Sequence, residues 1–227
     1  HLQRLAIKAA KEAIMETGQN NNVKIAGCFS PLPGSYFKDK SISKQEMIET
    51  YFSIGEIQKD AVDFFIIETM SSIDEAVSAV EALSNFNKEI ILCFCLSEGD
   101  GTKLFSGENL KEACDSIQID KINGLCLNCS QIEDISKGLD ILKKYNLPYG
   151  ALPNNFQSVK PLKLGMSVDN IKKRNDILIE DFVNYAVTWL NNGCTILGGC
   201  CEITPDYING LNNYFMNNRY KKTNLFN

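Results

Sequence analysis

Two adjacent cysteines behind two glycines, Gly198-Gly199-Cys200-Cys201, are the residues of this chain best suited to chemistry. Neighbouring cysteines seldom bond to each other, because a disulfide needs a narrow Cα–Cα geometry. A soft metal ion such as Zn²⁺ can instead be held by two consecutive thiolates at the irregular end of a strand. The glycines favour this interpretation, because they let the backbone bend tightly just before the pair.

A third thiolate would complete such a site, and Cys129 is the best candidate. Three protein thiolates leave one of the four zinc positions open for water or substrate, which is typical of a catalytic site. The alternative is three buried thiols that never meet. A closed structural site would need a fourth cysteine or histidine, and the only histidine, His1, is terminal and a poor candidate.

The remaining cysteines have simpler interpretations. Cys126 and Cys129 form a CxxC pair, but strand alternation turns the two thiols to opposite faces, which argues against a redox motif. Cys28 lies near a strand end, where we expect it to pack in the core or at the rim. Packing as small hydrophobic residues explains four others: Cys93, Cys95, Cys114 and Cys194.

Length and composition limit the class of protein. A chain of 227 residues with 44% hydrophobic residues is long enough for one α/β domain with a large core. A net charge of −5 argues against a nucleic-acid binder or a polybasic membrane protein, and no apolar run is long enough to span a membrane. Nine cysteines without a secretory segment favour a reducing, cytoplasmic compartment, and their odd number fits poorly with a closed disulfide framework.

A regular alternation of apolar runs and amphipathic segments must position the candidate residues. Strands are expected at 23–30, 62–68, 89–96, 122–129, 148–152 and 195–201. Helices are expected at 2–16, 43–59, 72–86, 107–117, 130–145, 179–192 and from 204 onward, followed by a frayed tail at 217–227. Ser43, Ser72 and Ser130 each precede a glutamate by three residues, which predicts a capping box at three of the helices.

Repeated strand–helix units predict a parallel α/β sheet, which leaves two architectures open. One is a doubly wound sheet of six strands, although no phosphate-binding glycine loop favours it. The other is a (β/α)₈ TIM-barrel type. The candidate residues Glu68, Cys129, Asn154 and Cys200-Cys201 all close or follow an expected strand, at the edge where such folds build active sites. Glu68 could instead cap a helix or pair with a lysine, and Asn154 could be a simple turn residue.

Several segments carry a family resemblance. GGCCEITPDYI at 198–208 resembles the GGCC-x-x-TP signature of the homocysteine S-methyltransferase family. GLCLNCS at 124–130, FFIIETM at 64–70 and ALPNN at 151–155 resemble further elements of that family, in the same order. The resemblance runs from about Val23 to Leu211, and it implies a zinc-dependent barrel that methylates homocysteine to methionine.

The resemblance also implies roles for individual residues. Cys129, Cys200 and Cys201 match the three zinc ligands of the family. Glu68 matches the acidic residue that holds the amino group of homocysteine, and Asn154 matches a residue that can take the fourth zinc position before substrate arrives. The implied partners are homocysteine and a small methyl donor, with no nucleic acid and no membrane. S-methylmethionine, S-adenosylmethionine, betaine and methylfolate all serve as donors within the wider family.

The chain departs from the family pattern at its amino-terminal side. The Asp-Gly-Gly and Thr-Asn-x-Tyr elements of the family are absent, and so is the glycine of its Pro-Asn turn. We therefore expect residues 1–227 to form a single homocysteine-binding-type domain, a partial barrel without its first two strands and first helix. Alternatives are a truncated zinc-binding barrel without activity, a chain that needs a partner or a missing segment, and a methyltransferase for another thiol such as selenocysteine.

Overall fold

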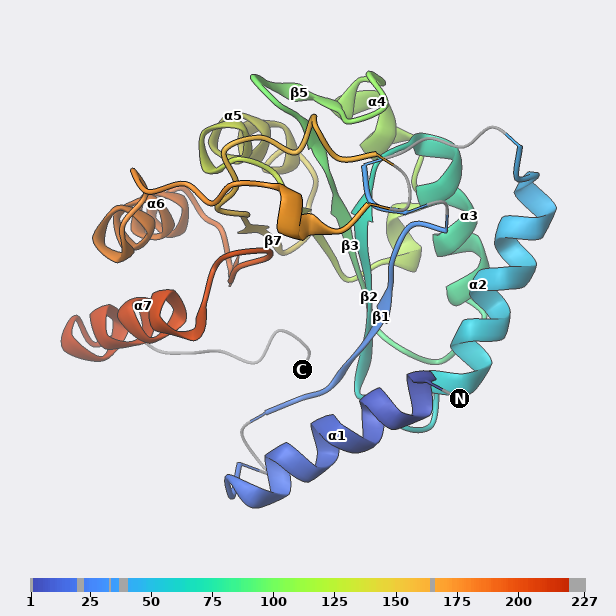
Figure 1. The fold of residues 1–227 in the computed structure, drawn as a ribbon. Coiled ribbons are helices and arrows are strands. Elements are labelled where there is room, and N and C mark those ends of the chain that lie inside the picture. Colours follow the sequence, from blue (N-terminus) through green and yellow to red (C-terminus); the bar gives the residue numbers. More distant parts are fainter. Residues whose placement is uncertain (1, 20–22, 33, 37–40, 164–165, 221–227) are drawn as a thin grey trace.

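The computed structural model describes residues 2–19, 23–32, 34–36, 41–163 and 166–220. A six-stranded sheet lies at the centre, with helices arranged in an arc around it (Figure 1). Every neighbouring pair of its strands is parallel. In spatial order the strands are β1 (Ala26–Phe29), β2 (Phe64–Met70), β3 (Ile90–Phe94), β6 (Gly124–Asn128), β7 (Tyr149–Leu152) and β8 (Ile196–Leu197).

The helices follow the expected alternation with the strands. They are α1 (Leu2–Glu16), α2 (Lys44–Gln58), α3 (Ile73–Leu83), α4 (Leu110–Asp115), α5 (Ile132–Leu142), α6 (Ile179–Asn191) and α7 (Pro205–Asn217), with 3₁₀ turns at Ile119–Lys121 and Val168–Asn170. None of the helices in the described part of the chain combines the length and apolar character needed to cross a membrane.

The strand order decides between the two architectures that the sequence left open. The six strands lie side by side in the order in which they occur in the chain. A doubly wound sheet would reverse direction at a switch point, whereas a barrel adds each strand beside the previous one. The expected barrel-type fold is therefore confirmed as a partial barrel, in which β1 and β8 are the two edges of the described sheet.

Two differences from the expected strands affect the site. The last strand was expected over 195–201, but β8 contains only Ile196 and Leu197. The chain leaves the sheet at the two glycines and closes a turn in which the Ile203 amide donates to the Cys200 carbonyl at 3.2 Å. A short hairpin, β4 (Leu96–Ser97) and β5 (Asp100–Leu104), was not expected, although Gly99 at its tip has the positive φ of 82° that such turns require.

One of the three expected capping boxes is present and two are wrong. Ser43 and Glu46 cap α2 reciprocally, as expected. Ser72 makes no side-chain cap, and its expected partner Glu75 instead accepts hydrogen bonds from the Leu32 amide at 2.6 Å and the Tyr51 hydroxyl at 2.9 Å. The Glu75 carboxylate is buried, so tertiary donors outweigh the local cap.

Ser130 was expected to cap α5, but the helix begins after Gln131 instead. The Ser130 hydroxyl accepts from the Leu96 amide at 2.7 Å and donates to the Asn128 carbonyl at 2.9 Å. This side chain therefore joins the ends of neighbouring strands at the edge that carries the candidate residues.

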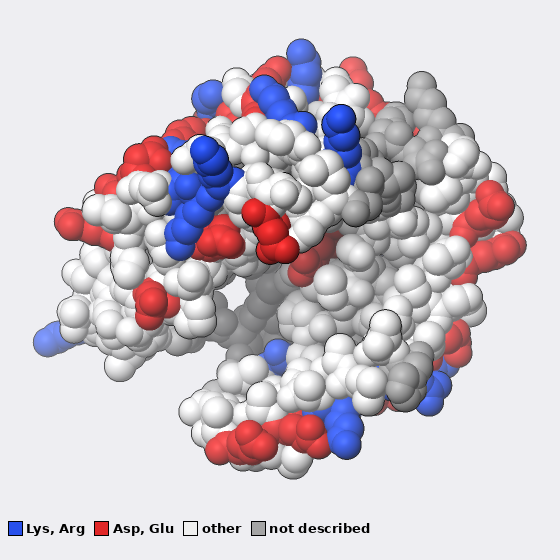
Figure 2. All heavy atoms as spheres, viewed as in Figure 1, with Lys and Arg blue, Asp and Glu red and all other residues white. Residues whose placement is uncertain are grey.

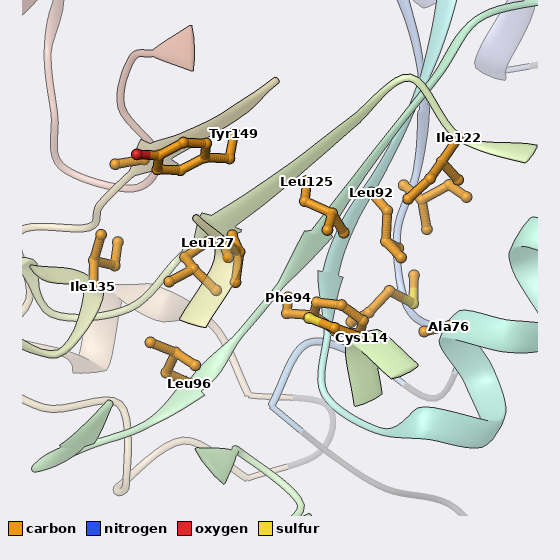
Figure 3. Packing of buried hydrophobic residues seen from close by; sticks show 14 of the residues in the cluster. Ala76, Leu92, Phe94, Leu96, Cys114, Ile122, Leu125, Leu127, Ile135 and Tyr149 are labelled. Carbon is orange, nitrogen blue, oxygen red and sulfur yellow. The ribbon is translucent and has the colours of Figure 1, made fainter. Parts of the chain in front are cut away.

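Alternate residues of each strand face opposite sides of the sheet. On the outer face, Leu92 and Phe94 of β3 and Leu125 and Leu127 of β6 pack beneath the helices (Figure 3). Each is fully buried, which contributes about 1.5–3 kcal/mol for a side chain of this size. The inner face carries a second cluster that includes Ile91, Cys93 and Cys126.

The carboxyl-terminal residues and the charged surface complete the description of the fold. Residues 218–220 of the expected frayed tail are described, with the Tyr220 ring 5.4 Å from the Phe215 ring; the rest of that tail lies outside the described residues. Figure 2 shows basic and acidic side chains interspersed over one face of the molecule, which is hollowed near its centre.

Candidate metal centre

The three candidate cysteines meet at the carboxyl edge of the sheet. Cys129 follows β6, and Cys200 and Cys201 follow β8. Their Sγ atoms all lie within 4.8 Å of one another, so the alternative of three thiols that never meet is wrong. The Cys201 Sγ is 3.8 Å from that of Cys129 and 3.9 Å from that of Cys200.

These separations can be compared with the needs of a metal ion. A tetrahedral Zn²⁺ with Zn–S bonds of about 2.3 Å places its sulfur ligands about 3.8 Å apart. The two separations from Cys201 match that value. Cys129 and Cys200 form a disulfide in this structure, so both sulfurs must be reduced to thiols before they can serve as ligands. The donor set therefore fits zinc in the reduced protein.

Backbone hydrogen bonds from the β7 end hold the two cysteine segments together. The Cys129 amide donates to the Leu152 carbonyl at 3.1 Å, and the Cys200 amide donates to the Pro153 carbonyl at 2.8 Å. A Cβ at Gly199 would collide with the Ile203 side chain, which explains the glycine directly before the cysteine pair. The position of the pair is thus fixed by β7 and by the following turn.

Several residues at this edge adopt a left-handed backbone that non-glycine residues seldom populate. Among the described residues, five non-glycine residues have positive φ, and four of them follow or end the strands at this edge. These four are Tyr36 (69°), Thr69 (59°), Cys129 (48°) and Glu202 (63°). Such conformations cost of order 1–3 kcal/mol each and gather at functional sites.

Asn154 lies beside the cysteines and is buried. Its side-chain amide donates to the Cys129 carbonyl at 2.8 Å, and its side-chain oxygen accepts from the Phe156 amide at 3.3 Å. In this structure Asn154 is therefore a turn residue that also supports the backbone of a cysteine. These hydrogen bonds fit the turn interpretation, and a role of Asn154 at the fourth zinc position stays a prediction.

Glu68 lies on the inner face of β2 and is half-buried. Burial raises the pKa of the Glu68 carboxyl, and a hydrogen bond with Cys28 partly opposes that change in pKa. Cys28 itself is exposed rather than packed in the core. At the amino end of α3, the Glu108 carboxylate accepts a hydrogen bond from the Ile73 amide at 3.2 Å. Glu108 therefore supplies the side-chain acceptor there, and not Glu68.

A hydrophobic wall that sequence reasoning missed surrounds the cysteines. It consists of the residues that pack in one cluster with Cys129, Cys200 and Cys201: Tyr36, Cys95, Phe105, Phe156, Val159, Leu162 and Ile171. Four of them come from the long loop after Asn154, and loops of this kind often carry function. Cys95 is buried as expected, but it belongs to this wall, where its thiol lies 3.6 Å from the Cys129 carbonyl oxygen.

An ion-pair cluster fastens this loop to α5. The Arg174 guanidinium donates to both carboxylate oxygens of Glu133, at 2.8 and 2.7 Å, and also to Asp176. The hydrogen bonds from Arg174 lower the pKa of the Glu133 carboxyl. The Arg174 amide donates to the Asn155 carbonyl at 2.9 Å, which ties the far end of the loop to the turn beside the cysteines.

Comparisons of the sequence with protein families and with individual proteins identify relatives of this chain. The profile of the homocysteine S-methyltransferase family matches residues 1–215. The selenocysteine methyltransferase of Astragalus bisulcatus is 30% identical over 157 residues, which cover 66% of this chain and 44% of that protein. Homocysteine S-methyltransferase 2 of Arabidopsis thaliana is 28% identical over 172 residues, or 72% of this chain and 48% of that protein.

A solved structure shows the same fold. The metallated form of the homocysteine methyltransferase MmuM from Escherichia coli superposes with a TM-score of 0.68 and 22% identity, over 93% of this chain and 68% of that one. The oxidized form of MmuM gives a TM-score of 0.65. This chain spans about half the length of the curated relatives that it matches. By its sequence match and its fold, the chain belongs to the homocysteine S-methyltransferase family.

Proposed function

We propose that residues 1–227 act as one homocysteine-binding-type domain that holds one Zn²⁺ through Cys129, Cys200 and Cys201. The domain transfers a methyl group to the thiol of homocysteine and produces methionine. The observation that carries this proposal is the convergence of three sulfur atoms at the carboxyl edge of a barrel-type sheet, in a chain of this family.

The chemistry follows from the sulfur ligands. A free thiol with a pKa near 8.5 is mostly protonated at neutral pH, although the thiolate is the nucleophile. Zinc bound at the three cysteines would deprotonate a thiol that enters the open position. The thiol proton would pass to solvent, and the sulfur would then attack the methyl carbon of the donor. As the new sulfur–carbon bond forms, the bond between that carbon and the donor atom would break, and its electron pair would leave on the donor atom.

Two side chains of this chain have supporting roles in the proposal. Glu68 accepts the ammonium group of homocysteine on the inner face, because a carboxylate held away from solvent gains most from a cationic partner. Asn154 is held beside the cysteines by its hydrogen bond to the Cys129 carbonyl, and its side-chain oxygen would be the ligand available to zinc before substrate binds. No general base and no covalent protein intermediate are needed.

Selenocysteine is a second candidate acceptor. One of the relatives is a selenocysteine methyltransferase, and a selenolate would bind and react at the same open position as a thiolate. The ratio of kcat/KM for the two acceptors distinguishes the candidates. The donor is to be identified by the same assay with S-methylmethionine, S-adenosylmethionine, betaine and methylfolate.

The test of the proposal is metal content after full reduction. We expect about one Zn²⁺ per chain in the wild type and strong loss of zinc in Cys201→Ser. Cys28→Ser is the matched control, because Cys28 is exposed, free and outside the cysteine cluster. Homocysteine should then add a fourth sulfur to the zinc coordination seen by X-ray absorption.

Other outcomes would lead to different conclusions. A folded, reduced wild-type protein that retains no zinc contradicts the proposal. Bound zinc whose spectrum is unchanged at saturating homocysteine indicates a zinc-binding barrel without activity. Activity that arises only after a second chain is added indicates that a partner completes the site.

A further inference from the structure

The hydroxyl of Tyr36 is buried at the metal centre, and no partner for it is found within the part of the chain that the structure describes. Tyr36 is 5% exposed, and no described residue makes a hydrogen bond of ordinary distance and angle with its Oη, although the Asn154 side chain lies close enough to oppose part of the rise in the Tyr36 pKa. An unpaired buried polar group costs about 1–3 kcal/mol, so native structures seldom retain one without a reason. This atom is therefore a candidate for contact with a ligand.

Tyr36 differs in kind from the other unpaired groups. Four buried side-chain atoms lack a partner among the described residues, and three of them are amide oxygens, which only accept. Tyr36 is the one that has a hydrogen to donate. A tyrosine hydroxyl has an ordinary pKa of about 10, so it carries its proton at neutral pH.

The ring of Tyr36 is held in place from several sides. It packs in the hydrophobic wall with Cys129, Phe156 and Val159, and its centroid lies 5.4 Å from that of Phe105. The Phe105 amide donates to the Cys95 carbonyl at 3.0 Å, so this neighbour is itself fixed to the sheet. The hydroxyl is consequently held in one place rather than free to turn toward solvent.

The backbone of Tyr36 adds an independent observation. Its φ of 69° is left-handed, which is rare for a bulky residue and costs free energy. Gly34, two residues earlier, also has a positive φ, of 115°. The chain thus adopts a strained turn that places an aromatic residue against the cysteines.

From this geometry we propose that the Tyr36 hydroxyl donates a hydrogen bond to the sulfur of the thiol that occupies the open position of the three-cysteine centre. This inference rests on the proposed function, because it requires a ligand at that position. A thiolate sulfur accepts hydrogen bonds well, whereas the thioether sulfur of a methylated product accepts them weakly. Tyr36 therefore acts as a positioning residue that favours the unmethylated thiol over the product.

The test is Tyr36→Phe, which removes the hydroxyl and keeps the ring. In the reduced, zinc-loaded protein we expect the dissociation constant of homocysteine, measured by titration calorimetry, to rise about tenfold. The dissociation constant of methionine should change less than about twofold, because its thioether is a weak acceptor. Zinc content should be unchanged, and the urea midpoint of the ligand-free protein should stay the same or rise.

Tyr51→Phe is the matched control with the opposite pattern. The Tyr51 side chain is fully buried, and its one hydroxyl hydrogen is shared between two acceptors away from the cysteines, the Glu75 carboxylate at 2.9 Å and the Ser30 carbonyl at 3.2 Å. This variant should lower the urea midpoint and leave the homocysteine dissociation constant unchanged. A purely structural role for Tyr36 would give the same pattern in Tyr36→Phe and would overturn the inference.

The remaining outcomes separate this inference from the proposed function. If the wild type binds zinc and homocysteine and Tyr36→Phe binds homocysteine equally well, the inference alone fails. Equal losses for homocysteine and methionine would also overturn it, because the hydroxyl would then contact the amino-acid part common to both. A wild type that binds neither zinc nor homocysteine overturns the proposed function and, with it, the inference.

Discussion

At the scale of single residues, the cysteines and Glu68 are positioned in different ways. The cysteines are placed by backbone: Cys129 by a left-handed φ of 48°, and Cys200 by its hydrogen bond to the Pro153 carbonyl. Glu68 is placed by the alternation of β2, which turns it to the inner face. The carboxylate there is partly removed from water before any cation is bound, which costs stability in the ligand-free protein.

The raised pKa of Glu68 predicts an effect of pH on stability. A carboxyl whose pKa is higher in the folded protein than in the unfolded chain destabilises the fold when it ionises. This penalty is absent below the ordinary glutamate pKa of 4.5 and grows as pH rises through the folded value. Glu68→Gln should therefore raise the free energy of unfolding at pH 7.5 but not at pH 4, as measured by urea denaturation.

The same variant should bind homocysteine less tightly. Glu68→Gln removes the charge that attracts the ammonium group, and we expect at least a tenfold weaker affinity at unchanged zinc content. Glu16→Gln, at the exposed end of α1, is the control and should change neither quantity. Equal stability of Glu68→Gln and wild type at both pH values would show that this carboxylate carries no burial penalty.

The sequence predicted some of these residues and missed others for a physical reason. The three cysteines were found because their types, glycines and strand-end positions form a local pattern. Tyr36 and Cys95 have no such pattern, because they reach the centre only through packing between segments distant in the chain. An aromatic residue two positions after a turn glycine is too common a feature to mark a site.

At the scale of elements, β7 is the part that positions the cysteine pair. β7 pairs with β6 on one side and with β8 on the other. Its last residue forms a backbone hydrogen bond with Cys129, and the two residues Pro153 and Asn155 after it form backbone hydrogen bonds with Cys200 and Cys201. Gly150 lies where β7 and β8 are closest. A Cβ there would collide with the Ile196 carbonyl and lie 2.5 Å from the Ile196 Cβ.

Gly150→Ala should therefore disturb the centre from a distance. Because the collision is with backbone, β8 must move away from β7 and carry Cys200 and Cys201 with it. We expect zinc affinity, measured by chelator competition in the reduced protein, to fall by more than tenfold, while circular dichroism shows that the helices remain.

Gly198→Ala provides a strict control for that variant. Gly198 is much nearer to the cysteines in sequence, but a Cβ there meets only the end of the Leu152 side chain, at 3.2 Å. A flexible side chain can move, so zinc affinity should be close to that of the wild type. If Gly198→Ala weakened zinc binding more than Gly150→Ala, the role given to β7 would be wrong.

Most elements could be predicted from the sequence, and the errors share one cause. Long periodic segments such as α2 and α5 were expected within a few residues of their true bounds. The Ser72 and Ser130 caps and the length of β8 were wrong, because hydrogen bonds to distant segments replaced the local ones. Local patterns describe what a segment prefers alone, and at the edge that holds the cysteines tertiary partners decide.

At the scale of the whole molecule, the centre joins parts of the chain that are far apart. Cys129 and Cys200 lie 71 positions apart in the sequence, and the chain between them includes α5, β7, the long loop and α6. Any bond between these two segments, whether through a disulfide or through a shared metal ion, restrains that whole region. The alternation of strands and helices was readable from the sequence, but the link between the ends of β6 and β8 depends on β7, which pairs with both strands.

Two alternative links at one place predict a dependence of stability on redox state and metal. Closing a loop of this length with a disulfide stabilises a protein by about 4 kcal/mol in the chain-entropy model. The reduced, zinc-free protein lacks both links and should have the lowest Tm. Zinc should raise the Tm of the reduced protein by binding the folded state, and it should leave the Tm of the oxidised protein nearly unchanged, because two of the three sulfurs are then unavailable.

Differential scanning calorimetry with and without a thiol-free reductant and Zn²⁺ measures all four states. Cys200→Ser is the informative variant, since it removes the disulfide and one metal ligand together. Its Tm should respond to neither the reductant nor zinc and should resemble that of the reduced, zinc-free wild type. An oxidised wild type that zinc stabilises as strongly as the reduced form would mean that the ion binds elsewhere, because a disulfide sulfur cannot act as a thiolate ligand.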